Sequence, residues 1–590
     1  MMRVPPASSA GGGVTPGAWV ASLLQAFPAL RSLLLLAPAL LFLGAFYIYP
    51  LAGVLWSSVS LPAPGLQNYA HFFRAGIYLH AFAITLRISL LVTALCLLLG
   101  YPVAYCLTRV RRTTRGIMLA LILIPFWTSL LVRTYAWMVI LQRHGIVNQL
   151  LSAAGLIDTP LALVYNTVGT VIGMTHILLP MTILSVYTVL LRIDLRLTRA
   201  ARTMGASPSA AFRHVYLPLS MPGVAAGALL TFVSCLGFYI TPALLGGSHD
   251  IFIAQLIQQQ IDVMLNVGFA AAIATMLLAV SIVLCLVYGR VALAGPAAGG
   301  GGNMFRPPGG DDDAEPGGGV PPLIGTLAGV VLAFLIAPIF VTVPLSFSAA
   351  EFLTFPPPGV SLRWYAAYLG SAQWRDATWL SLEVGAASAL LASVLGTLAA
   401  LGLAQPALPG KAALSALLIS PILVPVIIYA LAIYQLYARL HLIGTAGGLV
   451  LAYTVLGLPF VLITVSAALQ RFDTQLWAAA RTHGAGPLAT FRAVTLPLIR
   501  PSLVVGALLA FVASFDEVVV AIFISGASAI TLPKQMWDGV RSEINPTISA
   551  VATVMTLLSL GAMAAVALVM LGGGHWERRQ RAREALAASR

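Results

Sequence analysis

Long apolar runs dominate this sequence and restrict what it can fold into. Of its 590 residues, 59% are hydrophobic and only 8% are charged, whereas about a quarter of the residues of a soluble domain are charged. A helix that crosses a bilayer needs about 20 mostly apolar residues, and the runs have this length without the alternation of a membrane β-barrel. The sequence therefore predicts an all-α integral membrane protein with twelve transmembrane helices. We expect them near residues 32–56, 81–108, 117–141, 164–191, 217–245, 268–294, 323–348, 377–404, 412–437, 443–468, 496–523 and 548–572.

Positively charged residues are concentrated on one side of the expected topology. The net charge is +14, and with a cytoplasmic N-terminus the arginine groups within 109–115, 192–213 and 578–583 all fall on the inner side. Lysine and arginine gather on the cytoplasmic side of membrane proteins, so the charge indicates orientation rather than a nucleic-acid partner. Both termini are therefore expected in the cytoplasm. The first is a flexible tail rich in Gly, Pro, Ser and Ala, 1–30, and the second is a basic tail, 574–590.

A stretch rich in Gly, Pro and Asp, 295–322, divides the expected spans into two sets of six. It cannot bury apolar surface, so we expect a disordered linker between a first half, 31–294, and a second half, 323–573. Each half has an even number of spans, so both have the same orientation in the membrane. Secondary transporters also contain such parallel repeats, and the spans alone leave the class of transporter open. Matching residues of the two halves occur at two fixed offsets. At an offset of 296 residues, Gly100 and Pro125 correspond to Gly396 and Pro421. At an offset of 279 residues, the corresponding pairs are Pro180 and Pro459, Gly205 and Gly484, Pro218 and Pro497, and Pro222 and Pro501.

Two cytoplasmic loops, about 194–222 and about 473–501, carry the same pattern. Each begins with an aspartate suited to cap a helix and reaches a glycine that can close that helix in a left-handed conformation. A proline then starts a second helix at its favoured first position. The pattern predicts a helix–turn–helix with an apolar face and no partner within its own half. One such loop could rest on the inner membrane surface, whereas two matched copies favour docking onto a two-fold symmetric partner.

These loops resemble the EAA loop of binding-protein-dependent ABC importer permeases, whose pattern is approximately E-A-A-x-x-x-G-A followed by Phe and L-P-x-x-x-P. The leading Glu is replaced by Arg199 in the first half and by Ala478 in the second. In that family the loop is the coupling helix that contacts the ATP-binding subunit. The matching positions are Ala200, Ala201, Gly205, Ala206, Phe212, Leu217, Pro218 and Pro222, and in the second half Ala479, Ala480, Gly484, Ala485, Phe491, Leu496, Pro497 and Pro501.

The resemblance implies two parallel six-helix permease halves of the type I importer fold, fused in one chain. PFWTSLLVRTYAW, 125–137, and SFDEVVVAIF, 514–523, are similar to segments of the two permeases of spermidine/putrescine importers. The expected cargo is therefore a small cationic solute such as a polyamine, with ferric iron, an opine or a phosphonate as alternatives, and a secondary transporter as a further one.

The same resemblance implies the partners and the location of the chain. Two ATP-binding cassette subunits are expected on the cytoplasmic side of a bacterial inner membrane, and a solute-binding protein on the outer side. The only Gly-Lys pair, Gly410-Lys411, is followed by Ala412 where a P-loop needs Ser or Thr. We therefore expect ATP and Mg²⁺ on the partner subunits, and no catalytic residue and no cofactor in this chain.

An adjacent acidic pair, Asp516 and Glu517, lies within the expected eleventh span. Charged side chains in a bilayer need a functional or structural reason, and the 279-residue offset gives these two the counterparts Gly237 and Phe238. On a helix, adjacent side chains diverge by about 100°, so we expect at most one of them to face a transport path. The structural alternative is that the pair lies near a helix end or bonds a neighbouring helix.

Other residues of the spans are weaker candidates for the path. Arg133 can extend to the outer surface, or else pair with a buried acid or orient the pore. Trp127, Tyr135 and Trp137 fit an aromatic belt at the membrane interface, or a wall that binds organic cations. His176 is expected to be packed and hydrogen-bonded. The four cysteines lack the spacing of a metal site, and we expect no metal.

Overall fold

The computed structural model describes residues 28–294, 320–352, 354–405, 408–470, 474–542 and 546–588. Most of the predicted N-terminal tail and of the predicted linker lie outside these residues. Within them the secondary structure is helical, apart from an isolated β-bridge between Ser348 and Val360. The predicted all-α class is confirmed.

The helices before the linker alternate between long, apolar ones and short ones at the ends of the bundle. They are α2 Pro28–Leu43, η1 Gly44–Ile48, α3 Tyr49–Ser60, α4 Gln67–Arg74, α5 Gly76–Leu107, α6 Arg112–Trp127, α7 Leu130–Leu141, α8 Ile146–Ala153, α9 Thr167–Leu190, α10 Leu195–Thr203, α11 Pro208–Ala211, η2 Phe212–Tyr216, α12 Leu217–Leu236, α13 Ile240–Leu245, α14 Ile253–Asp262 and α15 Val267–Ala294.

The helices after the linker follow the same order. They are α16 Pro322–Ser346, α17 Arg363–Gly370, α18 Ala372–Ala404, α19 Lys411–Ile419, η4 Ser420–Ile422, α20 Val426–Leu440, α21 Ala446–Gln470, α22 Thr474–Thr482, α23 Pro487–Thr490, η5 Phe491–Thr495, α24 Leu496–Phe515, α25 Val519–Ile524, α26 Leu532–Ser542 and α27 Thr547–Ala588.

Ten helices of the described chain are long and apolar enough to cross a membrane, and there are twelve spans if each of two bent helix pairs counts as one. The bent pairs are the expected third and ninth spans, which break by 97° between α6 and α7 and by 91° before α20. The apolar runs predicted straight spans at both places, without these bends. In the first half the chain becomes extended at Thr128 and Ser129, and in the second half Pro425 is extended at the matching place.

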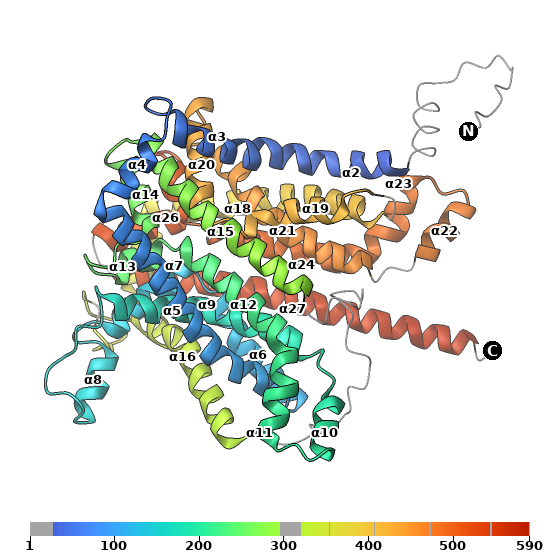
Figure 1. Ribbon diagram of the computed structural model, residues 1–590, viewed down its shortest axis with the longest axis horizontal. Coiled ribbons are helices and arrows are strands. Elements are labelled where there is room, and N and C mark those ends of the chain that lie inside the picture. Colours follow the sequence, from blue (N-terminus) through green and yellow to red (C-terminus); the bar gives the residue numbers. More distant parts are fainter. Residues whose placement is uncertain are drawn as a thin grey trace.

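The two halves are interlocked through their first spans. Helix α2 of the first half packs against α18 of the second, and α16 of the second half packs against α5, α6 and α7 of the first (Figure 1). At Gly402 of α18 a β-carbon would lie 2.7 Å from the Leu36 side chain of α2, so glycine permits this close approach. Each half therefore completes the core of the other.

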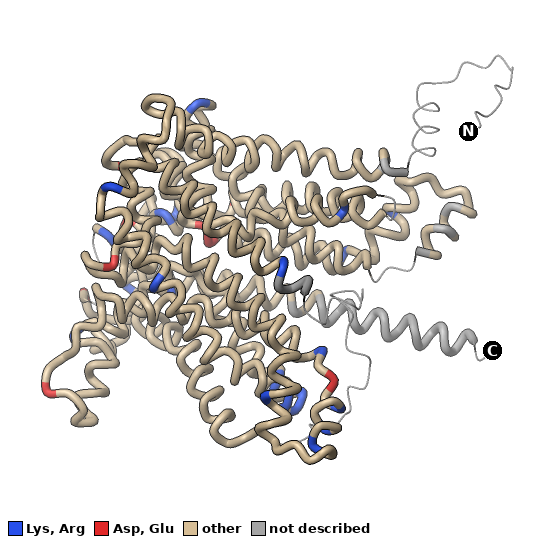
Figure 2. The backbone as a smooth tube through the Cα atoms, in the orientation of Figure 1, with Lys and Arg blue, Asp and Glu red and all other residues tan. Residues whose placement is uncertain are grey.

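The short helices gather at the two ends of the bundle. Helices α10, α11, α22 and α23 lie at one end, and α8, α13, α14 and α26 lie at the other (Figure 1). Figure 2 shows Lys and Arg gathered around α10 and the nearby loops. This is the end that the charge pattern predicts to be cytoplasmic.

Candidate transport site and coupling segments

The first coupling segment comprises α10, the turn after it and α11. Asp194 Oδ1 accepts a hydrogen bond of 2.8 Å from the Arg196 amide, which confirms the predicted helix cap. Gly205 has φ +91° and closes α10 in the left-handed region, and Pro208 is the first residue of α11. No residue of α10 is buried, and Met204 is 87% exposed. The segment therefore presents a free surface beyond the spans.

The second coupling segment repeats this geometry. Gly484 has φ +80°, Pro487 is the first residue of α23, and Leu488 is 61% exposed. Its predicted cap, Asp473, lies outside the described residues. The remaining predicted coupling residues lie on these two segments or at the helix that follows each: Ala200, Ala201, Ala206, Phe212 and Pro218 in the first half, and Ala479, Ala480, Ala485, Phe491 and Pro497 in the second.

A π-helical turn joins each coupling segment to the next span. The Leu217 amide bonds to the Phe212 carbonyl, and the Leu496 amide bonds to the Phe491 carbonyl. A proline follows directly in each half, as the second residue of α12 and of α24. Proline has no N–H and clashes with the carbonyl four residues before it, and the wider π turn absorbs that mismatch. Each segment is thus continuous with the span it precedes.

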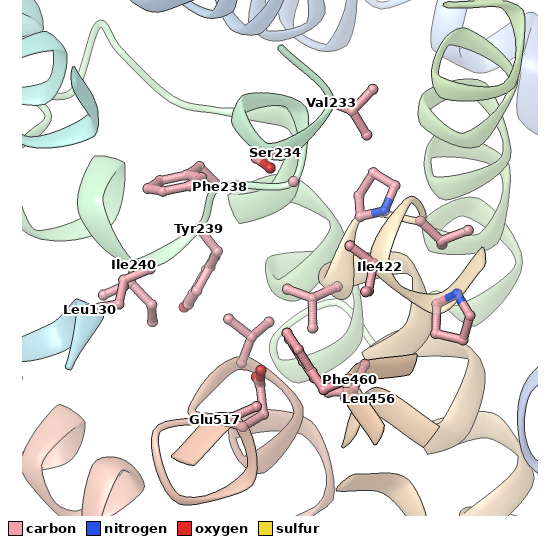
Figure 3. A pocket seen from close by; sticks show the side chains of 17 residues that line it. Leu130, Val233, Ser234, Phe238, Tyr239, Ile240, Ile422, Leu456, Phe460 and Glu517 are labelled. Atoms are coloured by element: carbon pink, nitrogen blue, oxygen red, sulfur yellow. The ribbon is translucent and has the colours of Figure 1, made fainter. Parts of the chain in front are cut away.

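A cavity of about 310 Å³ lies between the two halves. Its walls come from equivalent places: the ends of α12 and α24, and the breaks in the third and ninth spans. Figure 3 shows its lining side chains, with the Glu517 carboxylate directed into the space between them. The lining residues are Leu130, Val233, Ser234, Gly237, Phe238, Tyr239, Ile240, Pro421, Ile422, Val424, Pro425, Val426, Leu456, Phe460, Ala513, Glu517 and Val519.

The two acids of the pair have different surroundings. Helix α24 ends at Phe515, so both acids lie in the turn before α25 and not inside a helix, which the structural alternative foresaw. Glu517 lines the cavity, and one of its carboxylate oxygens accepts a 3.0 Å bond from the Val520 amide. Asp516 Oδ2 instead accepts a 3.1 Å bond from the Leu130 amide of the first half. Asp516 therefore joins the halves, and Glu517 is the acid at the cavity.

Arg133 lies inside the protein, and the expectation that it extends to the outer surface is wrong. Arg133 is buried, with 6% of its surface exposed. Its guanidinium group donates hydrogen bonds of 3.4 Å to the backbone carbonyls of Ser129 and Ile177. The Arg133 guanidinium also interacts electrostatically with the carboxylate of Asp516. His176 is fully buried, with Nε2 3.0 Å from the Leu335 carbonyl, as predicted for a packed histidine. The contact between His176 and Leu335 connects the first half to the second.

The chain matches the family described as "Binding-protein-dependent transport system inner membrane component" over residues 97–292 and 392–573, together more than half of its length. The chain belongs to this family. It is therefore a multi-pass permease component of an ABC importer and not an enzyme, and the secondary-transporter alternative is wrong. Permeases of this family work with ATPase subunits and a binding protein.

Curated relatives of the permease match about two fifths of it each. The spermidine/putrescine transport system permease protein PotB of Escherichia coli K12 is 33% identical over 225 residues, 38% of this chain and 82% of that protein. The putrescine transport system permease protein PotI of the same strain is 35% identical over 243 residues, 40% of this chain and 85% of that protein. A bacterial alginate ABC transporter, solved in complex with an alginate-bound periplasmic protein, aligns with a TM-score of 0.39 at 17% identity, over 46% of this chain and 96% of that chain.

The aromatic residues of the third span do not form a belt at the membrane surface. Tyr135 is fully buried, with its hydroxyl 3.2 Å from the Ser549 hydroxyl, and Trp137 packs against His176 and Phe334. Trp127 is half-buried at the end of α6. The 97° bend separates α7 from α6, and α7 is buried within the permease, so Tyr135 and Trp137 do not lie at the outer surface as they would on a straight span. Neither these three nor Arg133 is among the described residues that line the cavity.

Sequence reasoning missed the aromatic side chains that do line the cavity, namely Phe238, Tyr239 and Phe460. The repeat contained the signal for Phe238, because the 279-residue offset makes it the counterpart of Glu517. The cavity therefore has an acid from one half where the other half supplies an aromatic ring.

Proposed function

We propose that the permease carries a small organic polycation of the polyamine class, such as spermidine or putrescine, into the cytoplasm. The main support for this proposal is that the carboxylate of Glu517 lines the same cavity as the rings of Phe238, Tyr239 and Phe460. Opposite unit charges 4 Å apart attract by about 4 kcal/mol at an effective dielectric constant near 20. Aromatic faces add further attraction for ammonium groups. The names of the two curated relatives point to the same class of cargo.

We infer that a solute-binding protein delivers this cargo at the end that carries α8 and α14. Two ATP-binding cassette subunits would contact the segments around α10 and α22, whose free surfaces are suited to a partner. ATP and Mg²⁺ belong to those subunits in this proposal. The permease then lies in a bacterial inner membrane with both termini in the cytoplasm, and the bounds of its halves stay predictions.

Two of the alternative cargoes, a phosphonate and ferric iron, fit the cavity less well. A phosphonate is anionic and would meet the carboxylate of Glu517 at close range, which is unfavourable. Ferric iron needs several donor groups, and the described residues hold no cluster of three or more His, Cys, Asp or Glu that could bind a metal. The cavity supplies one carboxylate and several rings, which suits an extended organic cation better.

The two acids provide a matched test of the proposal. In proteoliposomes with the ATPase subunits and a matched binding protein, Glu517→Gln should lower spermidine uptake about tenfold or more, since a hydrogen bond to a charged group contributes about 1.5–3 kcal/mol. ATP hydrolysis stimulated by the binding protein should persist. Asp516→Asn keeps an oxygen that can accept the Leu130 amide, so it should retain uptake and mainly lower thermal stability through the loss of the charge near Arg133.

Uptake of radiolabelled spermidine and thermal unfolding of the purified complex give the two readouts. Equal uptake by Glu517→Gln and the unaltered permease would contradict the role of Glu517. If the permease and its ATPases are active with another binding protein and ligand, but never transport a polyamine, the cargo assignment is wrong while the importer assignment stands.

A further inference from the structure

An open pocket of about 510 Å³ lies beside the second coupling segment. Its volume is in the range of small-molecule sites. Two membrane-spanning helices, α2 and α18, form one side, and α22, α23 and the π turn η5 form the other. The lining residues are Leu34, Leu35, Leu398, Leu401, Gln405, Trp477, Pro487, Leu488, Thr490, Phe491 and Thr495.

The equivalent place in the first half is filled by aromatic side chains. The rings of Tyr105 and Tyr216 meet edge to face at 5.4 Å, and Phe212 lies 5.8 Å from the Tyr216 ring. The guanidinium of Arg109 lies over the Tyr105 ring at 4.4 Å. These side chains occupy the angle between α5 and the π turn that leads into α12.

The repeat shows why the second half is open where the first is filled. The 296-residue offset makes Leu401 and Gln405 of the second half the counterparts of Tyr105 and Arg109 of the first half. The 279-residue offset makes Thr495 the counterpart of Tyr216, and Phe491 the counterpart of Phe212. Two phenol rings and a guanidinium are thus replaced by smaller side chains, and all four second-half residues line the pocket. The pocket is the space that these rings fill in the first half.

One wall of the pocket is held by a hydrogen bond. Trp477 Nε1 donates to the Thr495 hydroxyl at 2.8 Å, which fixes the indole of α22 against the π turn. Thr490 donates its hydroxyl to the Gly486 carbonyl at 3.0 Å. The indole N–H and the Thr490 hydroxyl are bonded to protein partners, and most of the other lining side chains are apolar, so the interior is mainly apolar. Gln405 supplies a carboxamide at the lining.

The opening of the pocket is apolar and continues onto the surface of a membrane span. Leu34, at the lining, is 54% exposed, and Leu30 and Leu33 of the same helix are exposed beside it. On the other side of the pocket Leu488 is also exposed. Exposed apolar surface of this kind is unfavourable in water and favourable against lipid chains, so the helix that leads to the pocket borders the bilayer.

We propose that this pocket binds an acyl chain of a phospholipid from the leaflet nearest the coupling segments. The chain would lie between α2 and α18 and end against Trp477 and Phe491, with Gln405 available to bond an ester oxygen at the pocket rim. Because Trp477 belongs to α22, the lipid contacts the second coupling segment, while the aromatic side chains of the first half exclude one there. Lipid binding at this pocket is independent of the cargo that the permease carries.

Photolabelling of the full permease with its ATPase subunits tests this inference. The probe is a phosphatidylethanolamine with a diazirine in one acyl chain, incorporated into nanodiscs, and labelled peptides are identified by mass spectrometry. Peptides that contain Leu401 or Trp477 should be labelled in the unaltered permease. The double substitution Leu401→Tyr with Thr495→Tyr, which copies the first half, should abolish that labelling. Val394→Tyr is the matched control, because Val394 is an exposed residue of α18 outside the lining.

The outcomes separate lipid from other occupants. Undiminished labelling in the double variant, or no label in these peptides while other spans are labelled, would overturn the proposal. So would labelling by a diazirine fatty acid but not by the phospholipid, which would identify a free fatty acid. Labelling that occurs only when residues 2–27 are deleted would identify the N-terminal segment as the occupant. If the double variant fails to insert, Leu401→Phe must reduce the labelling, and unchanged labelling then contradicts the inference.

Discussion

Gly205 and Gly484 close α10 and α22 with a backbone conformation that side chains disfavour. Their φ angles are +91° and +80°, and a β-carbon at either position would have no atom within 4 Å. A substitution there meets strain in the backbone rather than a steric clash. Left-handed backbone costs an L-residue about 1–2 kcal/mol, and a β-branched residue tolerates it least.

Gly205→Val should therefore distort the first coupling segment and leave the spans folded. We expect normal membrane insertion, with transport and binding-protein-stimulated ATP hydrolysis largely lost. Gly205→Asn is the matched control, because asparagine accepts left-handed backbone, and it should retain most of both activities. Full stimulation of ATP hydrolysis in both Gly205→Val and Gly484→Val would show that these segments do not couple the permease to its ATPases.

Among single residues, those set by local sequence were predictable, and those set by a bend elsewhere in the chain were not. The helix cap of Asp194 and the glycine turns are local features, so the sequence predicted them correctly. The positions of Arg133 and Tyr135 depend on a bend of the chain several residues earlier, which no local pattern encodes. The different surroundings of Asp516 and Glu517 were foreseen, although the cause is the turn after Phe515 and not the 100° spacing of a helix.

At the scale of elements, the spans were predictable and their breaks were not. Length and apolarity identify a membrane span without regard to its direction, and residues 117–141 and 412–437 remain apolar through their bends. Prolines lie close to both breaks, at Pro125 and Pro425. Yet Pro180 and Pro459 lie inside continuous helices, so proline alone does not locate a break.

Helix α18 tests how closely the elements must pack. Gly402→Val would place atoms against the Leu36 side chain and the Ser32 carbonyl of α2. Overpacking of this kind costs about 1–3 kcal/mol, so the purified permease should unfold at a lower temperature and lose the contact between α2 and α18. A cysteine pair placed across these two helices should cross-link less efficiently in the variant.

Gly329→Val is the control, because Gly329 lies in the membrane helix α16 and a β-carbon there has no atom within 4 Å. This variant measures how much valine in place of glycine changes the stability of a membrane helix when no contact with a neighbouring helix is altered. An equal loss of stability in Gly329→Val and Gly402→Val would mean that the approach of α2 to α18 is not the cause.

For the whole molecule, the interlocked first spans imply that the halves hold together without the linker. Division of the chain near Gly309, with both parts expressed together, should restore transport to near the level of the fused permease. Helices α2 and α16 would still pack on the opposite halves. Uptake assays and co-purification of the two parts measure this result, and expression of either part alone is the control. If the two parts associate but do not transport, the linker has a role beyond that of a tether.

The packing of α2 against α18 also affects how the permease is made. The span that includes α2 ends at Ser60, whereas α18 begins at Ala372, so a ribosome adds some 300 residues before the partner of the first span exists. At about 5–20 residues per second this takes on the order of tens of seconds. During that time Leu36, Ala39 and Leu43, which are fully buried in the finished protein, must lie against lipid or an insertion factor. The first span to be synthesised is thus among the last to find its place.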